Sequence, residues 1–217
     1  MFALLGMKRT ANTTSSQLEF HPKHYATVDE VLHALNATTN TNGFSAIHFR
    51  AEKKGMNFKN CAKAIVDARN VMKQCSNLTS DHPFVLMTSL NLDPTVMWLG
   101  SEKIANESGS NSSDALRFLL HDNGFLKIDD LLKQTHKIDD AGILAVYDLI
   151  LAEKALQFAA CARDGGHGCN DATRKLCEEC NHVGKFGRLA LSMRKGKKDS
   201  WECWPQTKNQ EHPVGTD

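Results

Sequence analysis

The chain has 217 residues and a formal net charge of +1, from 26 Lys and Arg against 25 Asp and Glu. Its hydrophobic content of 41% and charged content of 24% are those of an ordinary globular protein, which argues against an intrinsically disordered chain. The near-zero net charge excludes a global attraction to nucleic acid or to anionic lipid, so any such attraction must come from a local segment.

The first residues are apolar from Met1 to Met7, and Lys8 and Arg9 follow this stretch. A secretion signal has its positive charge before the apolar run, and no run in the chain approaches the roughly 20 apolar residues that span a bilayer. We therefore expect a protein of the cytoplasm, the nucleus or both, which is not secreted and has no membrane partner. Residues 1–24 are otherwise polar and aperiodic and are predicted to form a mobile tail.

Asn-x-Ser/Thr triplets occur several times, but without a secretion signal they are expected to have arisen by chance, because Asn, Ser and Thr are abundant here. They begin at Asn12, Asn36, Asn77, Asn106 and Asn111.

Residues 25–106 are predicted to form a largely helical region with a small β component. The hydroxyl of Thr27 and the carboxylate of Glu30 have the spacing of a capping box, so a short helix is predicted to begin at Thr27. Short apolar runs at 44–49 and 84–90 are candidate strands, although the second would also suit a buried helix.

Helical periodicity is clear over Phe58–Leu78, where apolar residues recur every three or four positions. Cys61 and Cys75 lie on this apolar stripe, so both are predicted to pack in the core. A further helix is expected to begin at Asp93 and Pro94, because Asp is a good N-cap and Pro suits the first helical position.

The polar segment 107–113, with the sequence Glu-Ser-Gly-Ser-Asn-Ser-Ser, is predicted to be a linker. Residues 114–205, which follow this segment, are predicted to form a second helical region, and residues 206–217 are predicted to form a C-terminal tail. Gly124 is expected to end the first helix of this region, with Phe125 packing inward.

The longest helix is predicted over 139–162, because its apolar residues form a broad face suited to the centre of a core. This helix would place Cys161 at its C-terminal end.

The feature furthest from chance is a cluster of cysteines and histidines in the C-terminal third. Zinc prefers four tetrahedral ligands drawn from thiolate and imidazole, and the spacing Cys177-x2-Cys180 lets two sulfurs converge on one ion. In a chain without a signal peptide, such clustering favours metal binding over a disulfide framework. The predicted Zn²⁺ ligands are Cys161, His167, Cys169, Cys177, Cys180 and His182.

The spacing leaves open which four of these residues bind the ion. The surplus of ligands and the absence of the His-x-Glu and Pro-Cys-x-x-Cys deaminase signature favour a structural zinc over a catalytic one. Two alternatives are free buried thiols and a redox-active pair of Cys177 and Cys180. Glu178 and Glu179 disfavour the redox pair, because neighbouring carboxylates raise the pKa of a thiol.

A basic segment follows the cluster, with no Asp or Glu between Asn181 and Lys198. Cations contact phosphates and aromatic rings stack on unpaired bases, so the segment predicts a local interface for RNA or single strands. The alternatives are a solvated basic tail, a protein partner and a nuclear import signal. The predicted nucleic-acid contacts are Lys185, Arg188, Arg194, Lys195, Lys197, Lys198, Trp201 and Trp204.

The sequence therefore predicts a mainly α protein: a helical, bundle-like core with possible short strands near 44–49 and 84–90, and a C-terminal zinc-stabilised module. The predicted function is that of a zinc-binding, non-enzymatic nucleic-acid-binding protein. The first alternative is a zinc-stabilised protein–protein adaptor or regulatory protein. The second is a metal-dependent nuclease or other hydrolase, for which Glu52-x-Lys54 is a fragment of a motif and no catalytic residue is assigned.

Overall fold

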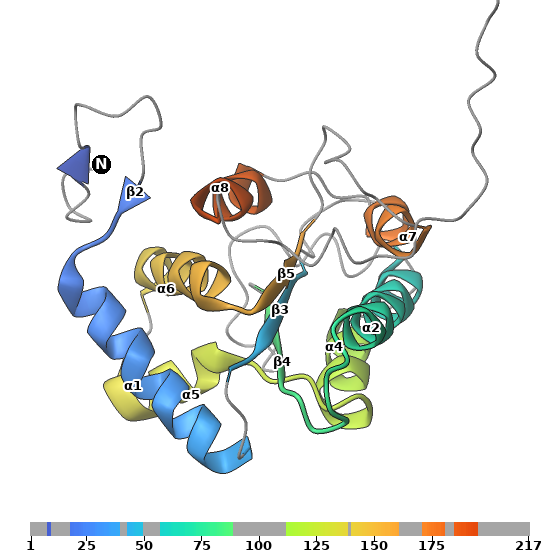
Figure 1. Cartoon of the computed structure of the whole chain (residues 1–217), viewed down its shortest axis with the longest axis horizontal. Helices are drawn as coiled ribbons and strands as arrows, with labels where there is room; N and C mark the ends of the chain where they lie inside the picture. The colour runs from blue at the N-terminus through green and yellow to red at the C-terminus, as the bar shows by residue number, and fades with distance from the viewer. Residues whose placement is uncertain are drawn as a thin grey trace, which may run out of the picture.

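The structure is a computed structural model, and it describes residues 8–9, 18–39, 43–49, 57–88, 112–138, 140–160, 171–180 and 185–194. Helices predominate in these ranges, which confirms the prediction of a mainly α protein. They enclose a small parallel sheet, so the architecture is three layers rather than a bundle (Figure 1). A zinc-stabilised module is not among the described parts.

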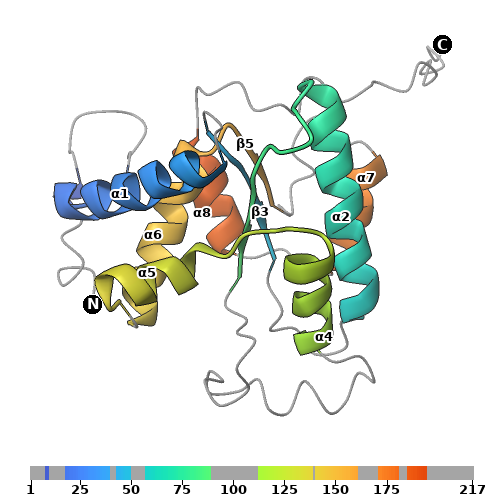
Figure 2. The ribbon, with the colours of Figure 1, turned by 90° about the horizontal axis from the view of Figure 1, so that it is seen from below.

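The helices fall into two groups on opposite sides of the sheet, and the view from below separates the groups most clearly (Figure 2). One group consists of α1 (Pro22–Thr39), α5 (Ile128–His136), α6 (Ala141–Lys154) and α8 (Lys185–Met193). The other consists of α2 (Phe58–Cys75), α4 (Ser112–Arg117) and α7 (Asp171–Glu179).

The sheet contains three parallel strands in the order β4-β3-β5. They are β3 (Ser45–His48), β4 (Phe84–Met87) and β5 (Gln157–Ala159). The structure confirms the candidate strands near 44–49 and 84–90, whereas β5 was not predicted. Ser45 is opposite Phe84 on one side and Gln157 on the other, which sets the register of both pairings.

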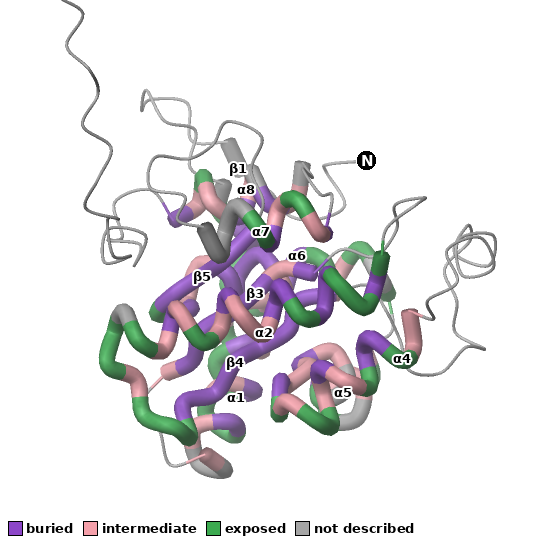
Figure 3. The backbone as a smooth tube through the Cα atoms, turned by 90° about the vertical axis from the view of Figure 1, so that its right-hand side faces the viewer, coloured by how far each residue is buried: buried purple, intermediate pink, exposed green. Residues whose placement is uncertain are grey.

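Both faces of the sheet are covered, as parallel sheets require, and Figure 3 shows the strands as a buried centre with exposed helix surfaces around it. Successive side chains point to opposite faces of a strand. Ala46 and Val85 therefore pack into the core on the α1 and α6 side, while Ile47 and Leu86 pack into the core on the α2 and α7 side.

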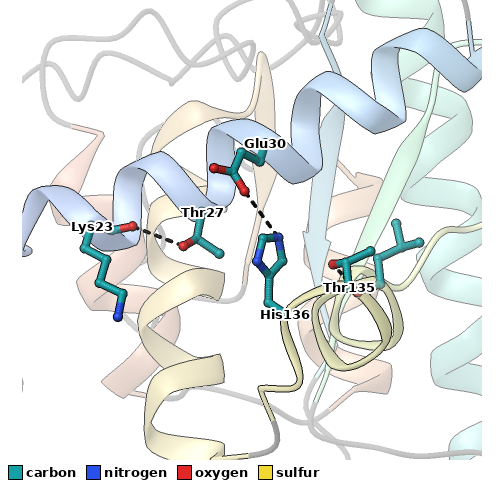
Figure 4. Close-up of polar contacts among 6 residues, drawn as sticks. Lys23, Thr27, Glu30, Thr135 and His136 are labelled. Carbon is teal, nitrogen blue, oxygen red and sulfur yellow. Dashed lines mark hydrogen bonds and ion pairs between the residues drawn. The ribbon is translucent and has the colours of Figure 1, made fainter.

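Helix α1 begins at Pro22, earlier than predicted, because Pro suits the first turn of a helix. Thr27 lies inside the helix, where its Oγ1 donates to the carbonyl of Lys23 at 3.1 Å (Figure 4). The predicted capping box at Thr27 is therefore wrong. Glu30 instead reaches α5, where its Oε2 lies 3.6 Å from Nε2 of His136 (Figure 4).

The long helix predicted over 139–162 is also wrong in the residues after Lys154. Helix α6 ends at Lys154, and Ala155 has φ −56° and ψ 142°, which is outside the helical region. The apolar residues behind it form β5, with Phe158 buried in the sheet. Cys161 therefore follows a strand rather than a helix.

The joint after α4 agrees with the prediction. A π-helical turn, η3 (Phe118–Asp122), follows α4 directly. Gly124 then has φ 65°, which suits glycine, and Phe125 is buried in the α2-side core.

Segments on both sides of the predicted linker contribute to one sheet, because β5 pairs with β3. Helix α4 begins at Ser112, inside the predicted linker. Near the N-terminus, β1 (Lys8–Arg9) pairs with β2 (Leu18–Glu19) inside the predicted tail. The expected helix at Asp93, residues 107–111 and the tail 206–217 lie outside the described residues. Within the described ranges, every helix is too short or too polar to cross a membrane.

Candidate functional site

A disulfide between Cys61 and Cys180 joins α2 to the end of α7, with the two Cα atoms 4.6 Å apart. Both residues are buried in the core, which confirms the core position predicted for Cys61. Their separation is 119 residues. In the chain-entropy account, a cross-link over so long a loop removes freedom from the unfolded chain worth roughly 5 kcal/mol. The pairing makes α7 part of the α2 layer. The side chain of Cys75, which was also predicted to pack in the core, is not described.

Cys177 lies one turn before Cys180 and is disulfide-bonded as well. It is partly buried against the α2-side core. A sulfur in a disulfide is not a thiolate and is not a zinc ligand. A zinc site that uses Cys177 and Cys180 therefore requires the reduced chain, and the expectation that these cysteines favour metal over disulfides does not hold for the state seen here.

The remaining predicted ligands lie outside the described residues. Among the described side chains, no three His, Cys, Asp or Glu gather closely enough to hold a metal ion. The ligands concerned are Cys161, His167, Cys169 and His182.

Arg194 is buried, with 1% of its surface exposed, and it caps α6. Its Nη1 donates to the carbonyls of Ala152 at 2.6 Å and Ala155 at 2.7 Å, and its Nη2 to that of Leu156 at 3.3 Å. The last carbonyls of a helix have no partner within the helix, and a cation there also complements the helix dipole. Arg194 thus anchors the end of α8 to α6, which corrects the prediction that its charge contacts nucleic acid.

The other predicted nucleic-acid contacts are not visible as side chains. Lys185 and Arg188 belong to α8, which packs against α6, but their side chains are not described. The rest lie beyond the described residues, namely Lys195, Lys197, Lys198, Trp201 and Trp204.

A second candidate site, which the sequence did not reveal, lies at the carboxyl edge of the sheet. In open parallel α/β sheets, ligands bind beyond the carboxyl ends of the strands, where the strand order reverses. Here the order reverses at β3, because β4 lies on one side of it and β5 on the other. The last residue of β3, His48, contacts Phe186 of α8, so this edge lies next to α8.

His48 is the last residue of β3 and is only partly buried. Its ring stacks on that of Phe186 from α8, with 4.7 Å between the ring centroids and an interplanar angle of 25°. The stack fixes the orientation of an imidazole, a group that can donate, accept or carry charge near neutral pH. The sequence offered one signal for this residue: a polar side chain at the end of a predicted strand.

Charged side chains lie close to one another beside β4. Leu126 pairs with Val85 in a short parallel bridge, so Lys127 continues toward the carboxyl end. The Nζ of Lys127 lies 2.9 Å from Oδ2 of Asp129. Burial, and then the charge of Asp129, raise the pKa of Asp148 on α6 well above its ordinary value, and Lys127 opposes this shift.

The amino edge of the sheet carries a buried polar network instead. The Oγ of Ser45 lies 2.9 Å from Nε2 of His82 and donates to Oε1 of Gln157 at 3.3 Å. The Nε2 of Gln157 donates to the carbonyl of Met72 at 3.3 Å and to Oγ of Ser76. These groups satisfy one another inside the protein, so the network is structural.

No protein-family model matches the chain, and neither the curated proteins nor the solved structures contain one with significant similarity to it.

Proposed function

We propose that this protein binds a phosphate-bearing small molecule at the carboxyl edge of its parallel sheet, next to His48. The observation that carries the proposal is the position of this imidazole at the end of the central strand, where the strand order reverses. Stacking on Phe186 holds the ring in place, and a preorganised group loses less freedom when it binds.

The composition of the segments that leave the strands supports a phosphate as the ligand. Residues 50–56 follow β3 and include Arg50, Lys53 and Lys54. Residues 161–170 follow β5 and include Arg163 and three glycines. Basic side chains pair with phosphate oxygens, and glycines permit close approach of main-chain N–H groups.

Inorganic pyrophosphate is the first probe, and calorimetric titration of the full chain measures its affinity. We expect His48→Ala to weaken binding about tenfold, which corresponds to roughly 1.4 kcal/mol, a typical loss for a hydrogen bond to a charged group. His33→Ala is the matched control, because His33 is exposed on α1. Wild-type protein that does not bind pyrophosphate, or a His48→Ala variant that binds equally well, would refute the proposal.

We propose nucleic-acid binding by the basic segment as a second function. The observation in its favour is that Arg194, the residue directly before Lys195, is held at the end of α6 by its hydrogen bonds. The segment of Lys195, Lys197 and Lys198 therefore starts from a fixed point on the protein, and its cations can face a phosphate backbone with less loss of freedom.

Binding to single-stranded RNA at several salt concentrations tests this second function. Changing the three lysines at 195, 197 and 198 to Glu should weaken binding and flatten its salt dependence, because fewer counterions are released. The control changes three exposed lysines elsewhere, Lys23, Lys59 and Lys63, to Glu and has the same net charge. Equal losses in both triple variants would indicate a general charge effect and no dedicated segment.

A further inference from the structure

The turn between α2 and β4 holds the triplet Asn77-Leu78-Thr79 in a fixed conformation. Asn77 has φ 48°, a left-handed conformation that Asn adopts more readily than most residues. The N–H of Leu78 bonds to the carbonyl of Lys73 at 3.1 Å, and that of Asn77 to Gln74 at 3.5 Å. This is the pattern of a Schellman C-cap, so the end of α2 determines the backbone of the triplet.

The three side chains of the triplet point in two directions. Leu78 is partly buried and packs against the α2-side core, whereas Asn77 and Thr79 are exposed. The described part of the chain offers the carboxamide of Asn77 no hydrogen-bond partner. The inward contact of Leu78 therefore presents both polar residues of an N-glycosylation motif to solvent.

The second triplet within the described ranges has a different environment. Asn36 lies in α1 and is partly buried, and its Oδ1 accepts a hydrogen bond from the N–H of Gly43 at 3.4 Å. Its carboxamide is thus part of the contact between α1 and the chain that enters β3. The triplets at Asn12, Asn106 and Asn111 lie outside the described residues.

The disulfides indicate the compartment in which the chain matures. Disulfides form and persist in oxidising compartments and are rare where glutathione keeps thiols reduced. Cys180 is bonded to Cys61 in the core, and Cys177, one turn away, is disulfide-bonded too. Two such cysteines so close together favour an oxidising compartment over the cytoplasmic or nuclear location expected from the first residues.

We propose that Asn77 carries an N-linked oligosaccharide, added in that oxidising compartment. The co-reactant is an oligosaccharide linked to a lipid through a diphosphate. A bond forms between Nδ2 of Asn77 and C1 of the first sugar, while the bond from C1 to the diphosphate oxygen breaks. The lipid diphosphate leaves with the bonding electrons, and a base of the transferase accepts the proton that Nδ2 loses.

The location of Asn77 is compatible with a bulky modification. The turn leads into the amino end of β4, so the glycan would project from the edge of the sheet opposite His48. Residues Ser76 to Asp81 are exposed except for Leu78, so the surface around Asn77 is open to solvent. A glycan there would leave the proposed phosphate site free, and the two proposals stand independently.

The test is peptide mapping of the full chain produced in eukaryotic cells and purified without reductant. Enzymatic removal of the glycan in heavy-oxygen water should leave a labelled Asp at position 77. Asn77→Gln and Thr79→Ala should each abolish the label and remove the same step in gel mobility. Thr79→Ala keeps Asn77 and its backbone conformation, so its result does not depend on the folding of the Asn77→Gln variant.

Two controls complete the test. Thr79→Ser keeps the hydroxyl and should keep the glycan. Asn70→Gln changes an exposed Asn on α2 that is followed by Val71 and Met72, and it should change nothing. Protein with the Cys61–Cys180 disulfide but an unmodified Asn77 would overturn the proposal, and so would protein in which these cysteines are free and Asn77 is unmodified.

Discussion

Cys61 and Cys180 join the first turn of α2 to the end of α7 across 119 residues of chain. Helix α2 is the connection between β3 and β4, whereas α7 follows β5, so the disulfide ties the C-terminal third to the first crossover of the sheet. The sulfurs lie in the core on one face of the sheet, where apolar side chains shield them from solvent.

Removal of this disulfide should destabilise the fold strongly. We expect the double variant Cys61→Ala and Cys180→Ala to lose about 2–5 kcal/mol of unfolding free energy, because the unfolded chain regains freedom. Urea denaturation of unreduced protein measures the loss, and wild type treated with reductant should move in the same direction. The disulfide assignment would be contradicted if the double variant were as stable as wild type and peptide mapping of wild type found a free Cys61.

Replacement of Arg194 tests whether this residue acts in the fold. Arg194→Met keeps an apolar stem but removes the donors to the carbonyls of Ala152 and Ala155, which then lie buried without partners. We expect a loss of about 2–4 kcal/mol in urea denaturation. Arg117→Met is the control, because Arg117 is exposed on α4, and it should change stability little. Equal stability of the two variants would argue against the capping role.

Protonation of His82 should weaken the protein at acidic pH. Burial, and then the nearby charge of Lys73, lower the pKa of His82, and Asp81 is the adjacent carboxylate. Below about pH 6.5 the imidazole of His82 is protonated in the unfolded chain but still neutral in the folded chain. The stability that this group contributes is therefore fully present above this pH and decreases as the pH falls toward the folded pKa. Urea denaturation at several pH values between 5 and 8 measures the slope.

His82→Asn should reduce this slope, at some cost in stability at neutral pH. It should not abolish it, because burial also lowers the pKa of His24. His33→Asn, on the exposed face of α1, is the matched control variant. An unaltered slope in His82→Asn would exclude His82 as its source.

The contribution of Asp148 to stability should depend on pH in the opposite direction from that of His82. Its pKa is raised by burial and by Asp129, so the folded chain holds a proton that the unfolded chain releases above about pH 4. The associated stability is present below this pH and is lost as the pH rises through the folded pKa. Asp148→Asn should therefore match wild type near pH 4 and equal or exceed its stability at pH 7 in urea denaturation. A variant less stable at pH 7 would show that the carboxylate makes a net favourable contact with Lys127.

Local signals predicted the parts of the fold that depend on neighbouring residues. The helical stripe of α2, the apolar runs of β3 and β4, and the joint at Gly124 and Phe125 were all correct. The errors occurred where two local signals competed. Helix α1 begins at Pro22 rather than at the capping-box pattern of Thr27. Helix α6 ends at Lys154, and the apolar residues that follow, which would suit a helix or a strand, form β5.

The sequence by itself determined the helical character, two of the three buried strands and the concentration of cysteines in the C-terminal third, because periodicity and composition are properties of short segments. Only the tertiary structure decided that the strands pair in the order β4-β3-β5, that Cys180 meets Cys61, and that Arg194 caps α6. Each of these contacts joins residues far apart in the chain, and one sequence contains no local signal for such partners. The same charge or thiol can therefore serve a ligand or the fold, and its burial in the folded protein decides between them.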